Sequence, residues 1–476
     1  MGGLNRATSL TLADLKRAIS DAEPQPFWLD QPAAPEPTEP LTGGLEVDLA
    51  VVGGGFSGLW TALLAKERDP DREVVLLEAK HVGWAASGRN GGFCSASLTH
   101  GLGNGMARFP DEIATLEEMG HRNLDEIEAT VARHDIDCGF ERTGDLDVAT
   151  APWQLADLRE YHEAATKLGQ RSEWLDAEGV RSEVNSPTYL GGVWKRDACA
   201  MVDPARLAWG LRETCRRQGV RIHEYTPVTE IRRTGDRLLL RVPHGAVSAS
   251  RVALGTGAHS NLLRRFSQYI VPVYDYALVT EPLSTAQLDS IGWRNRQGVS
   301  DSGNQFHYYR LTADNRILWG GYDAVYFAGG RIKPEYDQRP QTFLTLARHF
   351  FETFPHLAGV RFTHRWGGVI DTCSRFCAFF GTAYRGQLAY ALGYTGLGVG
   401  ASRFGAQVML DLLSGEPTER TRLRMVQTKP VPFPPEPLRT PVIQLTRWSI
   451  AQADRHEGRR NLWLRTLDRL GLGFDS

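Results

Sequence analysis

The stretch VDLAVVGGGFSGLWTALLAKERDPDREVVLLEA, from Val47 to Ala79, constrains the fold more than any other part of the sequence. Its apolar residues 47–52 are followed by a cluster of glycines, a pattern that predicts a strand ending in a tight turn. We expect a helix over 57–66 and a second strand over 73–77, which complete a βαβ unit. Because the first strand is almost wholly apolar, it is typical of a parallel strand covered on both faces. The stretch therefore predicts an α/β fold.

The glycines of this turn have the spacing of a dinucleotide-binding loop. Gly53, Gly55 and Gly58 form G-x-G-x-x-G directly between the strand and the helix. The first permits the turn, the second lets backbone approach a pyrophosphate, and the third lets the helix pack against the strand. Phe56 precedes the expected helix and Ser57 begins it, and the N-terminus of this helix offers N–H donors and a partial positive charge to phosphates.

An acidic residue follows at the end of the second predicted strand. Glu78, next to Ala79, lies about 20 residues beyond Gly58, where a carboxylate accepts from a ribose hydroxyl. NAD, FAD and S-adenosylmethionine are all alternatives at this point. A glycine turn without a ligand is a further alternative, but it leaves Glu78 unexplained.

The composition excludes several other classes of protein. The chain has 476 residues, 42% of them hydrophobic, and a net charge of −2. It can therefore bury a large core, and it carries no field that would attract nucleic acid. We find no apolar run of about 18 residues and no secretory signal. The six cysteines are scattered, which favours reduced thiols. We expect a cytoplasmic protein without a membrane or nucleic-acid partner.

The rest of the chain alternates between helical and β-rich segments. Helical periodicity covers 110–134 and 155–169, and a helix capped by Asp203 begins at Pro204. Short β segments fill 270–322, and the chain then returns to a last glycine turn near Gly393. This order predicts an α/β domain interrupted by a β-rich insertion.

Three further motifs accompany the loop and Glu78. They are GWAASGRNGG after Glu78, VALGTGAHS over 252–260 and GYTGLGVGASRFG over 393–405. From Val47 to about Gly415 the chain resembles the D-amino-acid-oxidase-like superfamily of FAD enzymes, closest to the γ-glutamylputrescine oxidoreductase-like branch. An NAD dehydrogenase or a methyltransferase would explain the first loop only.

This resemblance implies a mixed α/β fold of the glutathione-reductase type, in which a Rossmann-like FAD-binding domain is interrupted by a β-rich substrate domain. We expect FAD-binding segments at 45–150, 203–265 and 361–415, substrate-domain segments at 151–202 and 266–360, an N-terminal helix and proline-rich arm at 1–44, and a C-terminal extension at 416–476.

The resemblance also implies the residues that contact FAD. Beyond the first loop with Glu78 and Ala79, these are Ser87, Gly88, Arg89, Asn90, Gly91, Gly92, Val228, Gly255, Gly257, Gly393, Thr395, Gly396 and Gly398. Some relatives attach flavin covalently to a cysteine, but that position aligns nearer Gly368 than Cys373, and the N-terminal attachment histidine of others is missing. We therefore expect non-covalent FAD. Cys373 and Cys377 have no second cysteine pair or nearby histidine, so we expect no metal site.

Relatives oxidise the bond between a carbon and a nitrogen by passing a hydride equivalent to flavin N5, after which the imine hydrolyses. This implies a small-molecule amine substrate, with O2 or another electron acceptor; the oligomeric state is left open. Alternatives are an N-methyl or α-amino acid oxidase, and a non-catalytic flavoprotein within a pathway assembly.

The substrate class follows from missing cations. Relatives hold a substrate carboxylate with a lysine or an arginine, and these positions align with Gly400 and Gly396. The absence favours a primary or secondary amine without an α-carboxylate, with Arg403 as another cation to consider. In the β-rich insertion His307, Tyr308 and Arg310 are substrate-facing candidates, although strand alternation lets only alternate residues face one side. Aromatic walls suit an amine through packing and cation–π attraction.

Overall fold

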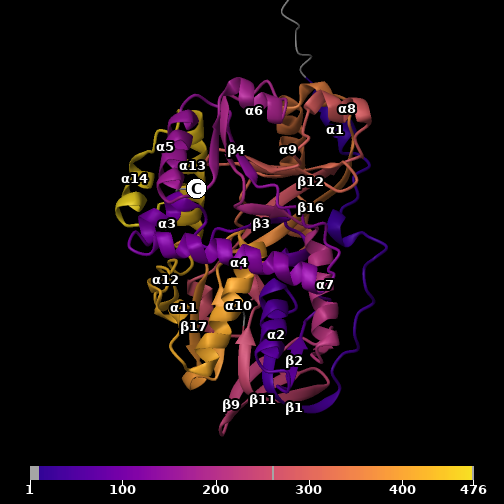
Figure 1. Cartoon of the computed structure of the whole chain (residues 1–476), viewed down its shortest axis with the longest axis vertical. Helices are drawn as coiled ribbons and strands as arrows, with labels where there is room; N and C mark the ends of the chain where they lie inside the picture. Colours follow the sequence, from indigo (N-terminus) through magenta and orange to yellow (C-terminus); the bar gives the residue numbers. More distant parts are fainter. Residues whose placement is uncertain (1–9, 260–261, 474–476) are drawn as a thin grey trace, which may run out of the picture.

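The computed structural model of the protein describes residues 10–259 and 262–473. Two eight-stranded sheets lie one above the other along the long axis of the molecule (Figure 1). The first sheet occupies the lower half of Figure 1 and the second the upper half. Ser260, the last residue of the VALGTGAHS motif, lies outside the described residues.

The first sheet is built around the predicted βαβ unit. Its strands, in order, are β17 (Phe379–Ala383), β18 (Leu388–Leu392), β11 (Gly245–Leu254), β1 (Gly43–Val52), β2 (Val74–Leu77) and β8 (Arg221–His223), with β10 (Arg237–Val242) and β9 (Glu230–Thr234) branching from β11. From β18 to β8 neighbouring strands pair in parallel, whereas β17 pairs antiparallel with β18.

Strand β1 is apolar because both of its faces are covered. Leu49 and Val51 pack in the core with the helices α2 (Phe56–Arg68), α4 (Ile113–Arg133), α7 (Pro204–Arg217) and α10 (Gly398–Ser414). Ala50 and Val52 pack on the opposite side with residues of β10 and β11. This confirms the predicted α/β fold with a parallel sheet at its centre. Asp203 caps α7 as predicted, since its carboxylate accepts from the amides of Ala205 and Arg206 at 3.0 Å.

The second sheet is mixed and contains most of the β-rich insertion. Its strands, in order, are β16 (Phe362–Thr372), β12 (Val271–Thr280), β15 (Ile317–Gly321), β14 (His307–Leu311), β13 (Gly298–Asp301), β4 (Asp145–Ala149), β6 (Gly191–Lys195) and β5 (Ser172–Leu175). One face packs on α1 (Leu12–Ala18), α6 (Ala177–Glu183), α8 (Thr285–Ile291) and α9 (Pro340–Thr353). The other face looks toward the first sheet.

Two strands fall on the other side of the expected domain boundaries. Strands β4 and β16 hydrogen-bond within the second sheet, whereas the expected boundaries at 150 and 360 placed them in FAD-binding segments. We therefore propose that both strands belong to the substrate domain. The strand pairing that decides this is long-range and leaves no local signal.

Smaller elements lie between and around the sheets. They are β3 (Phe93–Ser95) paired with β7 (Cys199–Met201), α3 (Leu102–Arg108), α5 (Gln154–Lys167) and the short 3₁₀ turns η1 (Phe27–Leu29), η2 (Ala86–Gly88), η3 (Gly257–His259), η4 (Arg264–Gln268), η5 (Pro334–Asp337), η6 (Pro355–Leu357) and η7 (Tyr384–Gly386). Across residues 10–259 and 262–473 no helix combines the length and the hydropathy needed to cross a membrane.

The N-terminal arm is held by Trp28. This side chain is 3% exposed, and its indole N–H donates to the carbonyl of Asn90 at 2.9 Å. Leu29 lies beside it, so close to the backbone of the GRNGG loop that a Cβ at Gly88 would be 2.7 Å from its Cδ2. The arm therefore supports this loop from behind.

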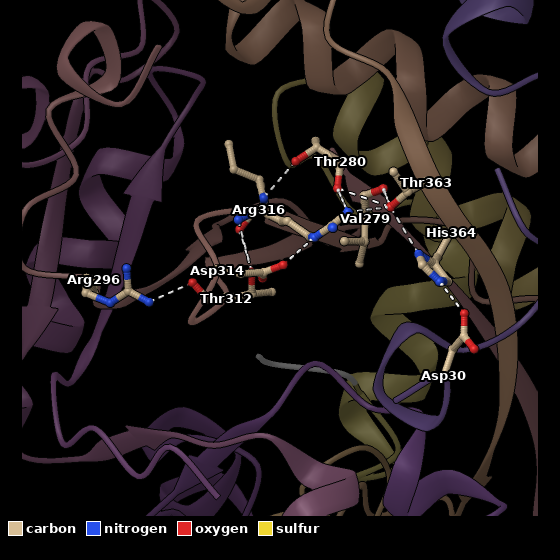
Figure 2. A network of polar contacts seen from close by, with 10 residues as sticks. Asp30, Val279, Thr280, Arg296, Thr312, Asp314, Arg316, Thr363 and His364 are labelled. Carbon is tan, nitrogen blue, oxygen red and sulfur yellow. Dashed lines mark hydrogen bonds and ion pairs between the residues drawn. The ribbon is translucent and has the colours of Figure 1, made fainter. Parts of the chain in front are cut away.

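A polar network fixes the arm to the second sheet (Figure 2). The guanidinium of Arg316 donates to the Thr280 carbonyl at 3.2 Å and to the Thr363 hydroxyl at 3.0 Å. The next residue, His364, lies 3.0 Å from the Asp30 carboxylate of the arm. The network joins β12, β15 and β16 to the arm, and so ties the support of the loop to the rigid sheet.

The C-terminal extension continues beyond α10 along the side of the molecule. It contains α11 (Glu419–Arg422), α12 (Arg424–Gln427), α13 (Arg439–Arg455) and α14 (Leu462–Arg469). In Figure 1 α13 and α14, in yellow, lie on the same side as α3 and α5. Arg108 of α3 donates to the Gly471 carbonyl at 2.7 Å, which fixes the last turn to the body.

Candidate cofactor and active site

A cavity of about 1800 Å³ lies between the two sheets. Its walls are formed by the carboxyl ends of β1 and β2, the N-termini of α2 and α10, residues 83–91, strands β12 and β16, and helix α13. The parallel strands of the first sheet thus end at the cavity, which is where open α/β sheets bind ligands.

The first glycine loop leaves its backbone open to this cavity. Gly53 has a φ of +107°, and a Cβ there would lie 2.5 Å from the carbonyl oxygen of Gly255. A Cβ at Gly58 would overlap the Gly53 carbonyl oxygen, so only glycine lets α2 pack this closely. Gly55 lines the cavity, and a Cβ there would lie 2.9 Å from the Ser87 Oγ. Gly53 and Gly55 themselves carry no side chain that would keep a ligand from this backbone.

Glu78 lies at the end of β2 and is 5% exposed. It accepts from the Gly54 amide at 2.5 Å, the Lys80 amide at 2.8 Å and the Trp84 indole at 2.7 Å. Burial raises the pKa of this carboxyl. The three donors use three of the roughly four acceptor positions of a carboxylate, which leaves one for a ligand hydroxyl.

Arg89 connects the GRNGG loop to the second sheet. Its Nε donates to the Trp84 carbonyl at 2.8 Å, and its Nη1 donates to Asp337 at 2.5 Å and to the Gly367 carbonyl at 3.2 Å. The side chain is 19% exposed and lines the cavity. Arg89 therefore bridges the two halves of the site.

Asn90 holds the shape of the same loop. Its amide donates to the Ser87 carbonyl at 3.0 Å, and its carbonyl oxygen accepts from the Gly92 amide at 2.8 Å. Gly91 faces the cavity and packs on an aromatic ring, because a Cβ there would lie 2.6 Å from Tyr308. The loop is thus fixed directly beside a residue of the second sheet.

The last glycine motif places the N-terminus of α10 at the cavity. Thr395 has a φ of +52°, a strained conformation for a β-branched residue. Its hydroxyl donates to the Gly393 carbonyl at 3.0 Å, and the Gly393 amide donates to Asp371 at 2.6 Å. Burial raises the pKa of Asp371 to about 6. The turn is held from β16, so Gly396 and Gly398 face the cavity in a fixed position.

Most of the residues expected to contact FAD line this cavity. They are Gly53, Gly55, Phe56, Ser57, Glu78, Ala79, Ser87, Arg89, Asn90, Gly91, Val228, Gly255, Gly257, Thr395, Gly396 and Gly398. Four others, Gly58, Gly88, Gly92 and Gly393, lie just behind its wall. The roles of the individual residues stay predictions, and for these four the structure indicates backbone packing.

Among the three substrate-facing candidates of β14, Tyr308 alone lines the cavity. Its hydroxyl donates to the Asp275 carboxylate at 2.6 Å. Arg310 points to the same side but lies behind the loop, where its Nη1 donates to the carbonyls of Val202 at 2.7 Å and Gly92 at 3.3 Å. Arg310 therefore has a supporting position.

His307 points to the opposite face of β14. Its ring contacts the Asp301 carboxylate at 2.6 Å and His349 at 3.0 Å. Strand alternation explains this placement, because His307 and Tyr308 are adjacent residues of one strand. The structure corrects the expectation for His307 and Arg310, which do not line the cavity.

Asp275 is a charged residue of the cavity that the sequence analysis did not select. It lines the cavity from β12 and also accepts from the Tyr276 amide at 2.8 Å. Burial raises its pKa to about 6. The available signal was a single carboxylate within the apolar and aromatic stretch YIVPVYDYALVT, where an unpaired charge is costly.

The cysteines of the sequence CSRFC point away from the cavity. Cys373 is buried, and its thiol donates to the carbonyl of Cys377 at 3.1 Å. Burial raises the pKa of Cys373 to about 11, which leaves the unreactive thiol form. Gly368, nearer the aligned attachment position, lines the cavity but offers no nucleophile.

These features fit an FAD molecule. Backbone without side chains lies where a pyrophosphate would be bound, two helix N-termini face the cavity, and a buried carboxylate lies at the end of β2. The cavity continues past this cradle to Tyr308 and Asp275, so it has room for both a dinucleotide and a substrate.

Comparisons with known proteins agree with this geometry. The family model described as DAO, FAD dependent oxidoreductase, matches residues 48–412. The γ-glutamylputrescine oxidoreductase of Escherichia coli (strain K12) is 32% identical over 389 residues, which cover 80% of this chain and 86% of that protein. The structure of glycine oxidase from Geobacillus kaustophilus superimposes with a TM-score of 0.65 at 19% identity, covering 79% of this chain and 96% of that one. L-Proline dehydrogenase from P. horikoshii gives a TM-score of 0.65 at 17% identity, over 81% of this chain and 96% of that one. The chain belongs to the DAO family of FAD-dependent oxidoreductases.

Proposed function

We propose that the chain oxidises the C–N bond of a primary or secondary amine without an α-carboxylate to an imine, which then hydrolyses. FAD, when bound, accepts the two electrons and the hydrogen of the carbon next to nitrogen. O2 or another acceptor completes the turnover. The proposal extends what the family gives, an oxidoreductase with a small-molecule substrate, and the printed name of the E. coli relative supports an amine.

The charge of the cavity carries this proposal. Its lining contains the carboxylates Glu78, Glu117, Asp145, Asp147, Asp157, Glu160, Asp275, Asp301 and Asp371, but among the described residues only the cations Arg89, Lys195, Arg447 and Arg460. Each of these cations already has a carboxylate partner, in Asp337, Asp145, Asp323 and Asp468 respectively. Several carboxylates are paired as well, since Asp145 and Asp147 share Lys195 and Asp301 contacts His307. The described lining thus offers a substrate carboxylate no lysine or arginine without a carboxylate partner, which favours an amine over an anionic substrate.

The two glycines at the family's carboxylate-binding positions support the same conclusion. A Cβ at Gly400 would overlap the Ser95 carbonyl oxygen, so a lysine does not fit there. Gly396 has open space around it, but its φ of +94° is one that L side chains rarely adopt. Arg403 points elsewhere and pairs with Glu126. The local backbone thus disfavours a lysine or arginine at both positions.

Tyr308 and Asp275 supply the polar group on the substrate side. We infer that the pair orients the amine nitrogen and that Asp275, once ionised, takes its excess proton through Tyr308. The amine must be neutral to be oxidised, and a carboxylate with a pKa of about 6 is ionised at neutral pH and can act as the acceptor.

Matched substrates test the proposal. Alkylamines and the α-amino acids that carry the same side chain should differ in kcat/KM by about ten- to a hundredfold in favour of the amine, because an unpaired carboxylate loses a charge-assisted contact. Loss of flavin absorbance under anaerobic conditions gives the readout without assuming an electron acceptor. A consistent preference for the amino acids would rule the proposal out.

A further inference from the structure

Part of the C-terminal extension forms a wall of the active-site cavity. Residues 431–434 and several residues of α13 line it, although the match to the family model ends at 412. The wall is therefore a feature of this chain that the family match does not cover.

One face of α13 is turned into the cavity. Val442, Ile443, Thr446, Arg447 and Ile450 line it, and their spacing places them on one side of the helix. They are half-buried. On the other side, Leu445 is 42% and Trp448 is 56% exposed. The inward face is apolar except for Thr446 and Arg447.

The positive charge of Arg447 is compensated by an ion pair. Its Nη2 donates to the Asp323 carboxylate at 3.1 Å, and burial lowers the pKa of its guanidinium. Because Asp323 also pairs with Arg339, this group belongs to a fixed ion-pair network. It fastens α13 to the second sheet and adds no free charge to the wall.

Further hydrogen bonds keep α13 in place. Gln444 donates to the Tyr326 carbonyl at 2.9 Å. Near the end of the helix, Asp454 accepts from the amides of Asn304 and Gln305, each at 2.9 Å. The bonds lie along the whole length of α13, so it is a rigid wall of the cavity.

The segment before α13 is fastened on the cofactor side. The Ser374 hydroxyl donates to the Val431 carbonyl at 2.6 Å, and the Phe433 amide donates to the Gln268 carbonyl at 2.6 Å. The extension thus runs from its contacts with Ser374 and Gln268 to the contacts of α13 with Asp323 and Asn304. It spans the cavity between its two attachments.

We propose that the inward face of α13 determines substrate specificity by packing against the carbon skeleton of the amine and limiting its length. This inference rests on the proposed function, since it assigns the part of the substrate beyond the nitrogen. The apolar side chains would contact an alkyl or aryl group, and removing that apolar surface from water would favour binding.

Tryptophan substitutions test the length limit. In Ile443→Trp and Ile450→Trp the larger ring fills the cavity, so the KM for octylamine should rise tenfold or more, while that for ethylamine changes less than about twofold. Leu445→Trp, on the exposed face of the same helix, is the matched control and should change neither value. Equal effects on both amines, or an equal effect of the control, would overturn the proposal.

Cysteine labelling gives a readout that needs no turnover. All six native cysteines are buried, so a new thiol can be followed with N-ethylmaleimide in the FAD-loaded enzyme. Leu445→Cys should react quickly, while Ile450→Cys should react at least tenfold more slowly and be protected by octylamine.

The two measurements distinguish failure of the proposed function from failure of the inference about α13. If octylamine protects Ile450→Cys but no amine reduces the flavin, the proposed function is wrong and the wall assignment stands. If amines reduce the flavin but octylamine gives no protection, or both cysteines react alike, α13 does not contact the substrate and the inference is wrong.

Discussion

Asp275 lowers the stability of the fold but has a role in the activity that we propose. Burial beside the cavity raises its pKa from the ordinary 3.8 to about 6, so the carboxylate costs folding free energy when it is ionised. The same carboxylate accepts from Tyr308 in the part of the cavity that we assign to substrate. A residue that weakens the folded state at neutral pH is thus retained at the site, a common trade between stability and function.

The Asp275→Asn variant separates these effects by pH. For the wild type we expect kcat/KM to fall below about pH 6 as Asp275 takes up a proton, and the variant should lose this acid limb and be about tenfold or more slower. Steady-state rates with an alkylamine between about pH 5 and pH 9 give the profile. An unchanged acid limb would assign it to another group.

The same variant should be more stable than wild type at a pH where it is less active. Because the folded pKa is raised, the stability due to the protonated carboxyl is present below about pH 4 and is lost as pH rises through about 6. Asp275→Asn should therefore unfold at a higher temperature than wild type at about pH 8 and at the same temperature below about pH 4. Calorimetry of the flavin-free protein measures this.

Gly55 is the position at which we expect the cofactor to approach the backbone of the glycine loop most closely. Gly55→Leu puts a side chain toward Ser87 and into the cavity, so the variant should fold but bind no flavin. Flavin absorbance per protein measures this. Gly44→Leu, in strand β1 and with open space around its Cβ, is the control and should keep a full complement of FAD. If Gly55→Leu still bound flavin, the glycine loop would have a role other than binding the cofactor.

The βαβ unit could be predicted almost completely from the sequence because its signals are local. An apolar strand, a glycine turn and a helix follow one another within a few dozen residues, and β1, α2 and β2 lie within a few residues of where they were expected. The cofactor cradle shares this property. Its glycines are motifs of neighbouring residues, and the first and last of these motifs are joined in space by the Ser57–Tyr394 hydrogen bond of 3.0 Å.

The substrate side could be predicted only in part. Whether His307 or Tyr308 faces the cavity depends on the register of β14 against β15, where His307 pairs with Gly321, and a shift of one residue would exchange the two faces. The position of α13 depends on contacts with Asp323 and Asn304, more than a hundred residues earlier in the chain. Neither the register of β14 nor the position of α13 is determined by residues that are neighbours in the sequence.

The N-terminal arm packs against the loop that we expect to contact FAD. Trp28→Ala removes a buried ring and the hydrogen bond to Asn90, and it should lower the free energy of unfolding by about 3–5 kcal/mol. Trp28→Phe keeps most of the volume and should cost less. If the arm supports the loop, Trp28→Ala should also raise the Kd for FAD, measured by titration of the apoprotein. Unchanged affinity would make the arm a purely structural support.

On the scale of the whole molecule, the cofactor should come away from the chain without bond cleavage. Cys373 is buried and its thiol donates to backbone carbonyls rather than facing the cavity. Precipitation in acid should therefore release all of the yellow colour as FAD, identified by chromatography. Colour that stays with the precipitated chain would mean a covalent bond, and Cys373→Ala would then show whether it is the attachment point.

The two sheets line opposite sides of the cavity, and polar contacts cross between them. Arg89 to Asp337 is one such contact, and the C-terminal extension makes others on the outer side of the cavity. The distance of Tyr308 and Asp275 from the cofactor cradle therefore depends on the contacts between the two sheets and on the structure of each sheet.

The extension has a consequence for the order in which the protein is made. Every strand of both sheets precedes Gly393, and residues 431–472 of the cavity lining are translated afterwards. Because domains generally fold during synthesis from the N-terminal side, we expect the nascent chain to present a finished cofactor cradle whose outer side is still open. FAD can then enter before α13 arrives, whereas a refolding full-length chain builds its wall and its cradle together.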